Sequence, residues 1–380
     1  MIYFDNNATT QVIPEVLDAM LPFLAGTFGN PSAAYSLGRN AGSAIDLARA
    51  SVARLVGARS ETEIVFTSGG TESDNWAILG ALEATGKKHI ITTRVEHEAV
   101  RKLCEQLEDR GVLVTWLDVD DQGSLDLEGL RSTLTNETAV VSIMLANNET
   151  GILFPVGEIG RIVRDHSNAL FHVDGVNAAG KVPIDLAQSE IDLFSISGHK
   201  FHAPKGVGAL YIRDGLNLPS MSIGGGQENG LRAGTEAVHQ IVGLGRAAEL
   251  AVDLEPMERI RGMRDRLESE ILTNIPDTRL NGTSDVSRRL PNTSSISFEN
   301  TNGEMIMAML DERGICVSTG SACNAHDHKA SAVLEAMNIP YSWAMGSIRF
   351  SLGRLNCENE VDDVLAVLPD IISGLRQISG

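Results

Sequence analysis

The chain has 380 residues, of which 43% are hydrophobic and 21% charged, and its formal net charge is −19. The length favours two domains, because a single hydrophobic core rarely grows to this size. The negative charge argues against nucleic acid or an anionic membrane as a partner, since both require a basic face. No stretch reaches the ~20 apolar residues of a membrane span. Residues 1–7 lack the basic and apolar regions of a signal peptide, so we expect a cytoplasmic protein.

Predicted strands and helices alternate along the first two thirds of the chain. Pro14 opens a helix at a position where its missing N–H costs nothing, and an apolar stripe predicts a second helix over 37–56. Strands are then predicted at 63–67, 89–93, 112–116, 139–145, 169–173, 191–196 and 208–212, and helices at 71–84, 99–110, 125–134 and 156–165. Repeated β–α units with β-branched strands indicate an α/β fold, with a mainly parallel sheet sandwiched by helices.

The pattern changes after a long helical region at 235–275, which is interrupted near Pro256. Strands at 293–298, 315–317 and 347–352 and helices at 304–313, 331–337 and 360–375 follow it. This last part is typical of a smaller α+β domain. We therefore expect a large domain over 14–255 and a small domain made of 1–13 and 256–380, to which the N-terminal arm returns.

Three strand ends carry complementary polar groups. Lys200 follows the strand 191–196, and an amine at the end of a buried strand loses its proton easily, as a Schiff-base lysine must. Gly70 and Thr71 stand at a helix start, where free N–H groups and a hydroxyl suit a phosphate. Asp174 ends another strand and suits a protonated ring nitrogen. Because ligands of open α/β sheets bind at the carboxyl ends of strands, these groups can converge on one ligand, pyridoxal phosphate.

Each of these signals has an ordinary alternative. The position of Lys200 is equally consistent with an ordinary surface lysine in a loop. Thr71 reads as the N-cap of a plain tight turn, and Asp174 as a helix cap. Short segments of this kind leave both interpretations open.

Longer motifs carry a specific resemblance. They resemble the NifS/IscS-type cysteine desulfurases, occur in that family's order and cover nearly the whole chain. The motifs are Asp5 to Thr10 (DNNATT), Phe66 to Asn75 (FTSGGTESDN), Val95 to His97 (VEH), Asn147 to Gly151 (NNETG), Gly198 to Gly208 (GHKFHAPKGVG), Arg232 to Thr235 (RAGT), Ser318 to Cys323 (STGSAC) and Ile348 to Arg354 (IRFSLGR). The stretch at 198–208 looks closest to the NifS branch, which serves nitrogen fixation.

The resemblance implies a homodimeric enzyme of pyridoxal phosphate fold type I. By position, Lys200 corresponds to the lysine that binds the cofactor covalently and Asp174 to the acid that pairs with the pyridine nitrogen. His97 corresponds to the histidine that stacks on the ring and takes part in acid–base steps, and Cys323 to the nucleophile.

Other positions correspond to binding residues of the family. Gly70, Thr71, Ser197 and His199 match the phosphate site, and Thr235 matches a phosphate ligand contributed by the second subunit. Asn148 and Arg349 match the groups that hold the substrate carboxylate, a task suited to arginine's planar fork.

The chain departs from the family at two places. Asn177 stands where the family usually has a glutamine that contacts the phenolic oxygen of the cofactor, so the shorter amide either keeps that contact or passes it to water. Residues 328–331 read His-Lys-Ala-Ser where the family often reads Leu-Glu-Pro-Ser. We expect loop mobility and acceptor docking to differ accordingly.

Four cysteines are present, and so few in a chain of this length do not suggest a disulfide framework. Cys104 and Cys316 lie in a predicted helix and strand and are expected to be small buried hydrophobes. Cys323 is followed by His326 and His328, but this spacing matches no common zinc site, so we expect no metal.

The resemblance predicts a cysteine desulfurase. It would convert L-cysteine to L-alanine, leave a persulfide on Cys323 and donate the sulfur to an iron–sulfur scaffold protein, with nitrogenase as one destination. A selenocysteine or cystine lyase is the alternative within enzymes. A metal-binding scaffold using Cys316, Cys323 and the two nearby histidines is the alternative from another class.

Overall fold

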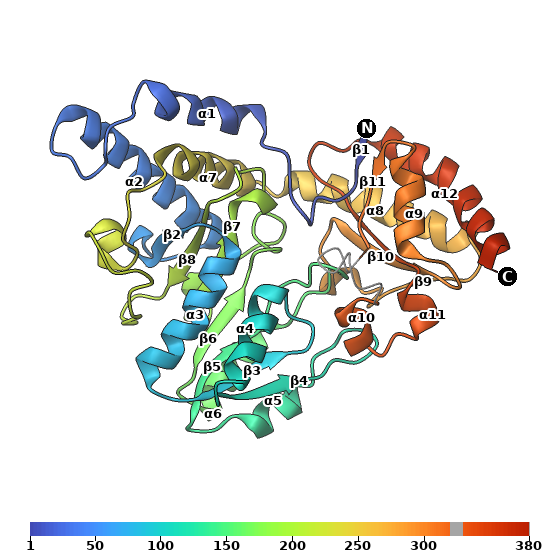
Figure 1. The fold of residues 1–380 in the computed structure, drawn as a ribbon, viewed down its shortest axis with the longest axis horizontal. Helices are drawn as coiled ribbons and strands as arrows, with labels where there is room; N and C mark the ends of the chain where they lie inside the picture. The colour runs from blue at the N-terminus through green and yellow to red at the C-terminus, as the bar shows by residue number, and fades with distance from the viewer. Residues whose placement is uncertain (320–329, 380) are drawn as a thin grey trace.

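A seven-stranded sheet forms the centre of the larger part of the molecule in the computed structural model, which describes residues 1–319 and 330–379 (Figure 1). Its strands are β2 (Ile64–Thr67), β3 (His89–Thr93), β4 (Leu113–Leu117), β5 (Thr138–Ser142), β6 (Leu170–Asp174), β7 (Leu193–Ser197) and β8 (Gly208–Ile212). Their order across the sheet is β2-β8-β7-β6-β5-β3-β4. Neighbouring strands are parallel, except that β8 runs antiparallel to β2 and β7. The mainly parallel sheet predicted from the sequence is confirmed.

Both faces of this sheet are buried because its strands present apolar side chains on alternate sides. In β2, Phe66 joins one core cluster, whereas Val65 joins another that includes Trp76. The first face is covered by α1 (Pro14–Ala25), α2 (Ser36–Val56), α6 (Val156–His166) and α7 (Val238–Ala251), with α5 (Leu127–Thr133) near the edge. The other face is covered by α3 (Gly70–Thr85) and α4 (Glu98–Glu108). Figure 1 shows α1, α2 and α7 stacked together above the sheet.

A second core lies around a three-stranded antiparallel sheet of order β12-β10-β9. Its strands are β9 (Thr278–Leu280), β10 (Thr293–Phe298) and β12 (Ser347–Ser351), and its helices are α8 (Glu255–Asn274), α9 (Gly303–Asp311) and α12 (Glu358–Ser379). Two short helices, α10 (Ala332–Ala336) and α11 (Tyr341–Ala344), lie between this sheet and the larger core. The smaller α+β unit matches the expectation, while the proposed boundaries at residues 14 and 255 stay a prediction.

The N-terminal arm joins the two parts of the molecule. Strand β1 (Ile2–Tyr3) pairs in parallel with β11 (Ile315–Cys316), and Asp5 bridges to Ser351. A few residues later the Thr10 N–H donates to the carbonyl of His199, 2.8 Å away. The arm therefore begins in the small unit and ends beside the segment that carries Lys200.

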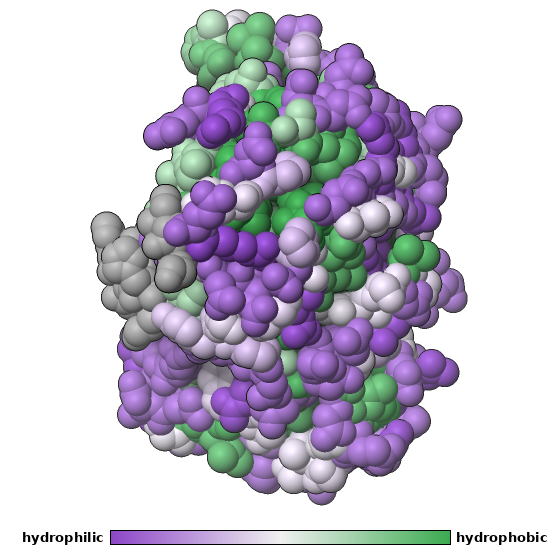
Figure 2. All heavy atoms as spheres, turned by 90° about the vertical axis from the view of Figure 1, so that its right-hand side faces the viewer, coloured by the Kyte–Doolittle hydropathy of each residue, from purple (hydrophilic) through white to green (hydrophobic). Residues whose placement is uncertain are grey.

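Most predicted elements coincide with the observed ones to within one or two residues. The region 235–275 divides into α7 and α8 with Pro256 in the first turn of α8, which explains the interruption seen in the sequence. No helix in the described ranges is long and apolar enough to cross a membrane. The face that includes α9 and α12 is mainly hydrophilic, with apolar residues showing in patches between polar ones (Figure 2).

Candidate active site

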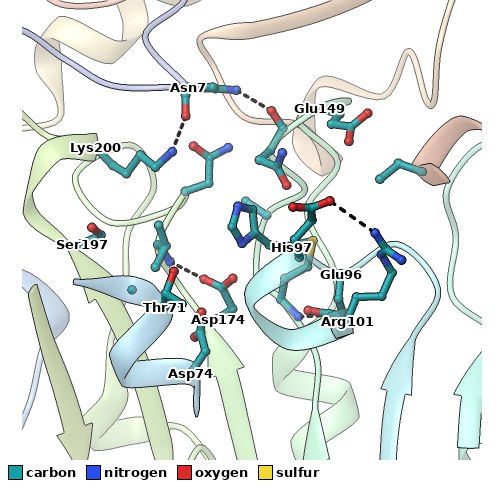
Figure 3. Close-up of a pocket in the computed structure, with 18 of the residues that line it drawn as sticks. Asn7, Thr71, Asp74, Glu96, His97, Arg101, Glu149, Asp174, Ser197 and Lys200 are labelled. Atoms are coloured by element: carbon teal, nitrogen blue, oxygen red, sulfur yellow. Dashed lines mark hydrogen bonds and ion pairs between the residues drawn. The ribbon is translucent and has the colours of Figure 1, made fainter. Parts of the chain in front are cut away.

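A cavity of about 360 Å³ opens at the carboxyl ends of β6 and β7, beside the first turns of α3 and α4. Ten of the residues predicted from the sequence line it: Gly70, Thr71, His97, Asn148, Asp174, Asn177, Ser197, His199, Lys200 and Arg349. In Figure 3, Thr71 and Ser197 lie on one side, His97 and Glu149 on the other, and Asp174 between them. Segments that are distant in the sequence thus meet around one space.

Lys200 lies in a single 3₁₀ turn that directly follows β7. Its Nζ donates to the backbone carbonyl of Asn7 at 2.5 Å (Figure 3) and to that of Ala8 at 3.1 Å. The strand end and the N-terminal arm together fix the amine at the cavity wall. A lysine held in this way is placed to react with a carbonyl compound in the cavity.

An acid and an imidazole face the same space as the lysine. The Asp174 Oδ1 accepts from the Val176 N–H at 2.9 Å, and burial raises the pKa of Asp174 against the opposing effects of His97 and Lys200. His97 caps α4, since its Nδ1 accepts from the Ala99 N–H at 3.1 Å. Burial lowers the pKa of His97, with Asp174 opposing this effect, so the ring is neutral and carries its proton on Nε2.

The end of the cavity beside the start of α3 suits an anion. Helix α3 begins at Gly70, and its first N–H groups and the positive end of its dipole stand beside Ser197. The preceding Gly69 has a φ of 152°, and a Cβ on Gly208 would lie 2.8 Å from the Gly69 Cα. The absence of side chains at these positions lets strand and helix start approach closely. His199 contributes a neutral ring, because burial lowers its pKa to about 4.

Arg349, in the middle of β12, forms another part of the cavity wall. Its Nη2 donates to the Asp5 Oδ1 at 2.6 Å and its Nη1 to the Asn148 carbonyl at 2.9 Å. Its Nε is buried and has no hydrogen-bond partner among the described residues. The guanidinium is thus held from one side and keeps donor capacity for a further ligand.

Asn177 supplies another donor that protein groups leave unused. Its Oδ1 accepts from the Lys181 Nζ at 2.8 Å, whereas its buried Nδ2 has no partner within the described part of the chain. Buried donors are seldom left unpaired in folded proteins. The orphaned nitrogens of Asn177 and Arg349 therefore indicate that a ligand with acceptor groups belongs in the cavity.

Several site residues were not singled out from the sequence. Asn7 and Asp5 lie in a quoted motif, but their contacts to Lys200 and Arg349 could not be read from it. Asp74 and Glu96 also line the cavity, and each has a buried carboxyl oxygen that accepts no hydrogen bond from the described residues. The one of Asp74 lies 3.6 Å from His172 Nε2. Burial raises the pKa of Asp74, and it raises that of Glu96 to about 8. In the sequence, the only indication that Asp74 and Glu96 belong to the site is that they lie within the longer motifs.

Two predicted residues are not part of this cavity as described. Thr235 is exposed and lines a separate cavity of about 190 Å³ together with Ser68 and Arg232. Cys323 lies outside the described residues, as do His326 and His328. Among the described residues, no cluster of His, Cys, Asp and Glu side chains suits a metal ion.

Comparison with known proteins agrees with this geometry. Residues 2–364 match the family described as "Aminotransferase class-V". A cysteine desulfurase of Trichormus azollae is 52% identical and covers all of this chain and 94% of its own. The cysteine desulfurase NifS of Azotobacter vinelandii is 49% identical with the same coverage. A solved "NifS-like protein" superposes with a TM-score of 0.91 at 40% identity, covering 98% of this chain and 100% of its own. A structure described as "SspA in complex with cysteine" gives a TM-score of 0.82 at 36% identity, covering 94% and 100%.

The chain belongs to the class-V aminotransferase family, whose members are pyridoxal phosphate enzymes of fold type I. Within that family its relatives are the NifS-type cysteine desulfurases. The cavity fits the cofactor, because an anion site, a buried acid, an amine and the unpaired Asn177 amide line one space of suitable size.

Proposed function

We propose that the chain is a pyridoxal phosphate-dependent cysteine desulfurase that converts L-cysteine to L-alanine and keeps the sulfur as a persulfide on Cys323. The observation that carries the proposal is the convergence of Lys200, Asp174, His97 and Arg349 on one cavity. Relatives at about 50% identity over the full length are cysteine desulfurases, in agreement with this chemistry.

The cofactor would be held at five points. Gly70 and Thr71 at the start of α3, with Ser197 and His199, surround the phosphate. Asp174 pairs with the ring nitrogen, His97 lies against the ring, Asn177 donates to an oxygen of the ring, and Lys200 provides the covalent attachment. When bound, the cofactor supplies an electron sink for the negative charge that forms at the substrate Cα.

The substrate would be held and deprotonated by residues of this chain. Arg349 and Asn148 bind the carboxylate, and the orphaned Nε of Arg349 supports this role. The Lys200 amine, released when substrate binds, accepts the Cα proton. His97 is neutral and can both accept and donate a proton during the steps that follow.

Sulfur transfer requires a thiolate, which we assign to Cys323. Its sulfur attacks the sulfur of the substrate, so that an S–S bond forms and the substrate C–S bond breaks. The electron pair of the broken bond stays with the carbon, which takes up a proton to give the methyl group of alanine. The products are L-alanine and an enzyme persulfide, and no external oxidant or reductant is consumed.

Replacing Cys323 with serine tests this assignment. We expect the Cys323→Ser protein to bind the cofactor and show its yellow absorbance but to form no persulfide from L-cysteine. Mass spectrometry of the wild-type protein after one turnover should locate one extra sulfur on Cys323. Normal alanine production by Cys323→Ser would contradict the proposed function.

We also propose a homodimer in which Thr235 binds the cofactor phosphate of the partner subunit. Thr235 is exposed and lies outside the cavity of its own chain, and the neighbouring Arg232 is fixed to Glu72 at 2.5 Å, beside the start of α3. Apolar side chains that a monomer would leave in water lie on and near α1 and α2: Leu17, Leu21, Leu24, Phe28, Tyr35 and Leu47. A dimer interface over these helices would bury them.

For the fate of the sulfur, we propose transfer from Cys323 to an iron–sulfur scaffold protein, with nitrogenase maturation as one use. The relative named NifS supports this choice. Incubating the ³⁵S-labelled persulfide enzyme with a purified scaffold should move the label to the scaffold, whereas a scaffold without its cysteines should acquire none.

A further inference from the structure

Lys181 is a buried lysine for which the proposed reaction has no use. It is 7% exposed and lies in the turn that follows β6. Its Nζ contacts three oxygens: Asn177 Oδ1 at 2.8 Å, the Asn177 carbonyl at 3.1 Å and Asn7 Oδ1 at 3.2 Å. A protonated lysine has three N–H donors and a neutral one has two, so this arrangement matches the ammonium form.

The contact with Lys181 fixes the orientation of the Asn177 side chain. An ammonium can only donate, so the Asn177 atom that faces it must be the oxygen. The NH₂ group is then directed away from Lys181, and it is the buried nitrogen without a partner among the described residues. Because Asn177 lines the cavity, Lys181 determines that this position presents a donor and not an acceptor.

The same ammonium acts electrostatically on Lys200. Both amines bind Asn7, Lys181 through its side-chain oxygen and Lys200 through its carbonyl. Burial, followed by Lys200 and Arg349, lowers the pKa of Lys181 well below its usual 10.5, whereas the three oxygens around its Nζ favour the ammonium form. Within the described part of the chain, the other charged or titratable groups near the two amines include Asp174 at the end of β6, His97 before α4, and His199 and His202 after β7. Arg354 lines a small cavity together with both amines, and the exposed Lys205 acts on His199.

We propose that Lys181 is a positioning residue of the cofactor site: it holds Asn177 as a hydrogen-bond donor toward the cofactor and places a positive charge beside Lys200. The proposal rests on the function proposed above and deepens it. It also explains how an asparagine serves where the family usually has a glutamine, since the shorter amide is held at a fixed orientation.

A pH titration of the holoenzyme's visible absorbance tests the charge. This absorbance reports protonation of the nitrogen at position 200, and a neighbouring positive charge disfavours the protonated form. We expect Lys181→Met to raise the titration midpoint by about one pH unit. Lys205→Met is the matched control, because it removes the same charge at an exposed position, and its shift should stay below about 0.3 unit.

A double-mutant cycle on cofactor affinity tests the orientation. Asn177→Ala and Lys181→Met should each raise the apparent dissociation constant of the cofactor by about three- to tenfold. The dissociation constant of the double variant should not exceed the larger of the two single-variant values, because Lys181 acts through Asn177. Effects that multiply would show that the two residues act independently and would overturn the orientation role.

A neutral variant with a polar tip covers the case in which Lys181→Met does not fold. Lys181→Gln removes the same charge and retains a donor, so its midpoint should also rise by about one unit. An unchanged midpoint in the variant that folds overturns the charge role. If wild-type protein neither binds the cofactor nor releases alanine from cysteine, the proposed function itself fails, and that outcome is distinct from a normal enzyme whose Lys181 variants titrate as wild type.

Discussion

Three carboxyl groups share the floor of the cavity: Asp174, Asp74 and Glu96 (Figure 3). Burial raises the pKa of all three, and the charge of Asp174 further raises that of Asp74 and Glu96. Asp174 differs from the others, because the neighbouring His97 and Lys200 favour its ionised form. The pKa values of Asp74 and Glu96 are opposed only by hydrogen bonds, from Ser195 and from Thr93 and Met144 respectively. The site therefore favours an ionised Asp174 beside a protonated Asp74 and a protonated Glu96.

The first prediction separates Asp174 from Asp74. An asparagine mimics a protonated acid, so Asp174→Asn should remove a charge that the reaction uses and Asp74→Asn should remove none. We expect kcat for alanine formation to fall by about 10²–10³ in Asp174→Asn and by less than about threefold in Asp74→Asn. A larger loss in Asp74→Asn than in Asp174→Asn would refute the assignment.

The second prediction concerns stability and Glu96. Burial raises the pKa of Glu96 from 4.5 to about 8, so between these values the folded protein holds a proton that the unfolded chain releases. This group therefore makes the free energy of unfolding fall as the pH rises through that window, by up to about 1.4 kcal/mol per pH unit.

Glu96→Gln should remove this dependence. Its thermal midpoint should decrease less than that of the wild type between pH 5 and pH 8. Glu137→Gln, at an exposed position, is the control and should behave as the wild type. A decrease in Glu96→Gln that is equal to or steeper than that of the wild type would show that Glu96 is ionised in the folded protein.

At the scale of elements, helix starts surround the cavity. Gly70 of α3, Glu98 of α4 and Ala332 of α10 all line it. Ser331 caps α10 by accepting from the N–H groups of Val333 and Leu334, and its hydroxyl also donates to the Glu149 carboxylate. One serine therefore joins the start of α10 to the cavity wall.

The third prediction uses this dual role. Ser331→Ala should cost about 1 kcal/mol of stability through the lost cap, and it should also slow persulfide formation because the start of α10 loses its contact with Glu149 in the cavity wall. Asn302→Ala removes a comparable cap from α9, where Asn302 accepts from the N–H groups of Glu304 and Met305. It should cost similar stability and leave the persulfide rate unchanged. Equal persulfide rates in both variants would contradict the proposed role of Ser331.

The elements themselves were largely predictable from the sequence. Strands such as β3, β8 and β10 were placed correctly because a buried strand has a local signature of apolar, β-branched residues bounded by turns. Ten of the residues that line the cavity followed from the family motifs. The roles of Asn7 and Lys181 did not follow, because their contact joins residues 174 positions apart and depends on tertiary packing. The amide orientation at Asn177 likewise appears only once Lys181 is placed beside it.

At the scale of the whole molecule, Thr235 lines a cavity separate from the one that contains Lys200 of the same chain. In the proposed dimer each active site would combine Lys200 of one subunit with Thr235 of the other. A defect in either residue would then damage a different site, which complementation between variants can detect.

The fourth prediction is restored activity in a mixed dimer. Lys200→Ala should be inactive, and Thr235→Ala should bind the cofactor weakly. When the two proteins are mixed and allowed to exchange subunits, the heterodimer gains one intact site, so cofactor retention and alanine formation should rise above those of both separate proteins. Sedimentation velocity checks that the mixture is dimeric. If mixing restores nothing while exchange occurs, Thr235 acts within its own subunit.

The pairing of β1 with β11 has a consequence for the order in which the enzyme matures. The strands of the large sheet are all contained within residues 64–212 and can associate while the chain is still being synthesised. Residues 2–7, although made earlier, are held by strand β11 and by Ser351, which are made much later. The Asn7 and Ala8 carbonyls thus reach Lys200 only after Ser351 has been translated. Cofactor loading is accordingly expected only after β12 has been synthesised.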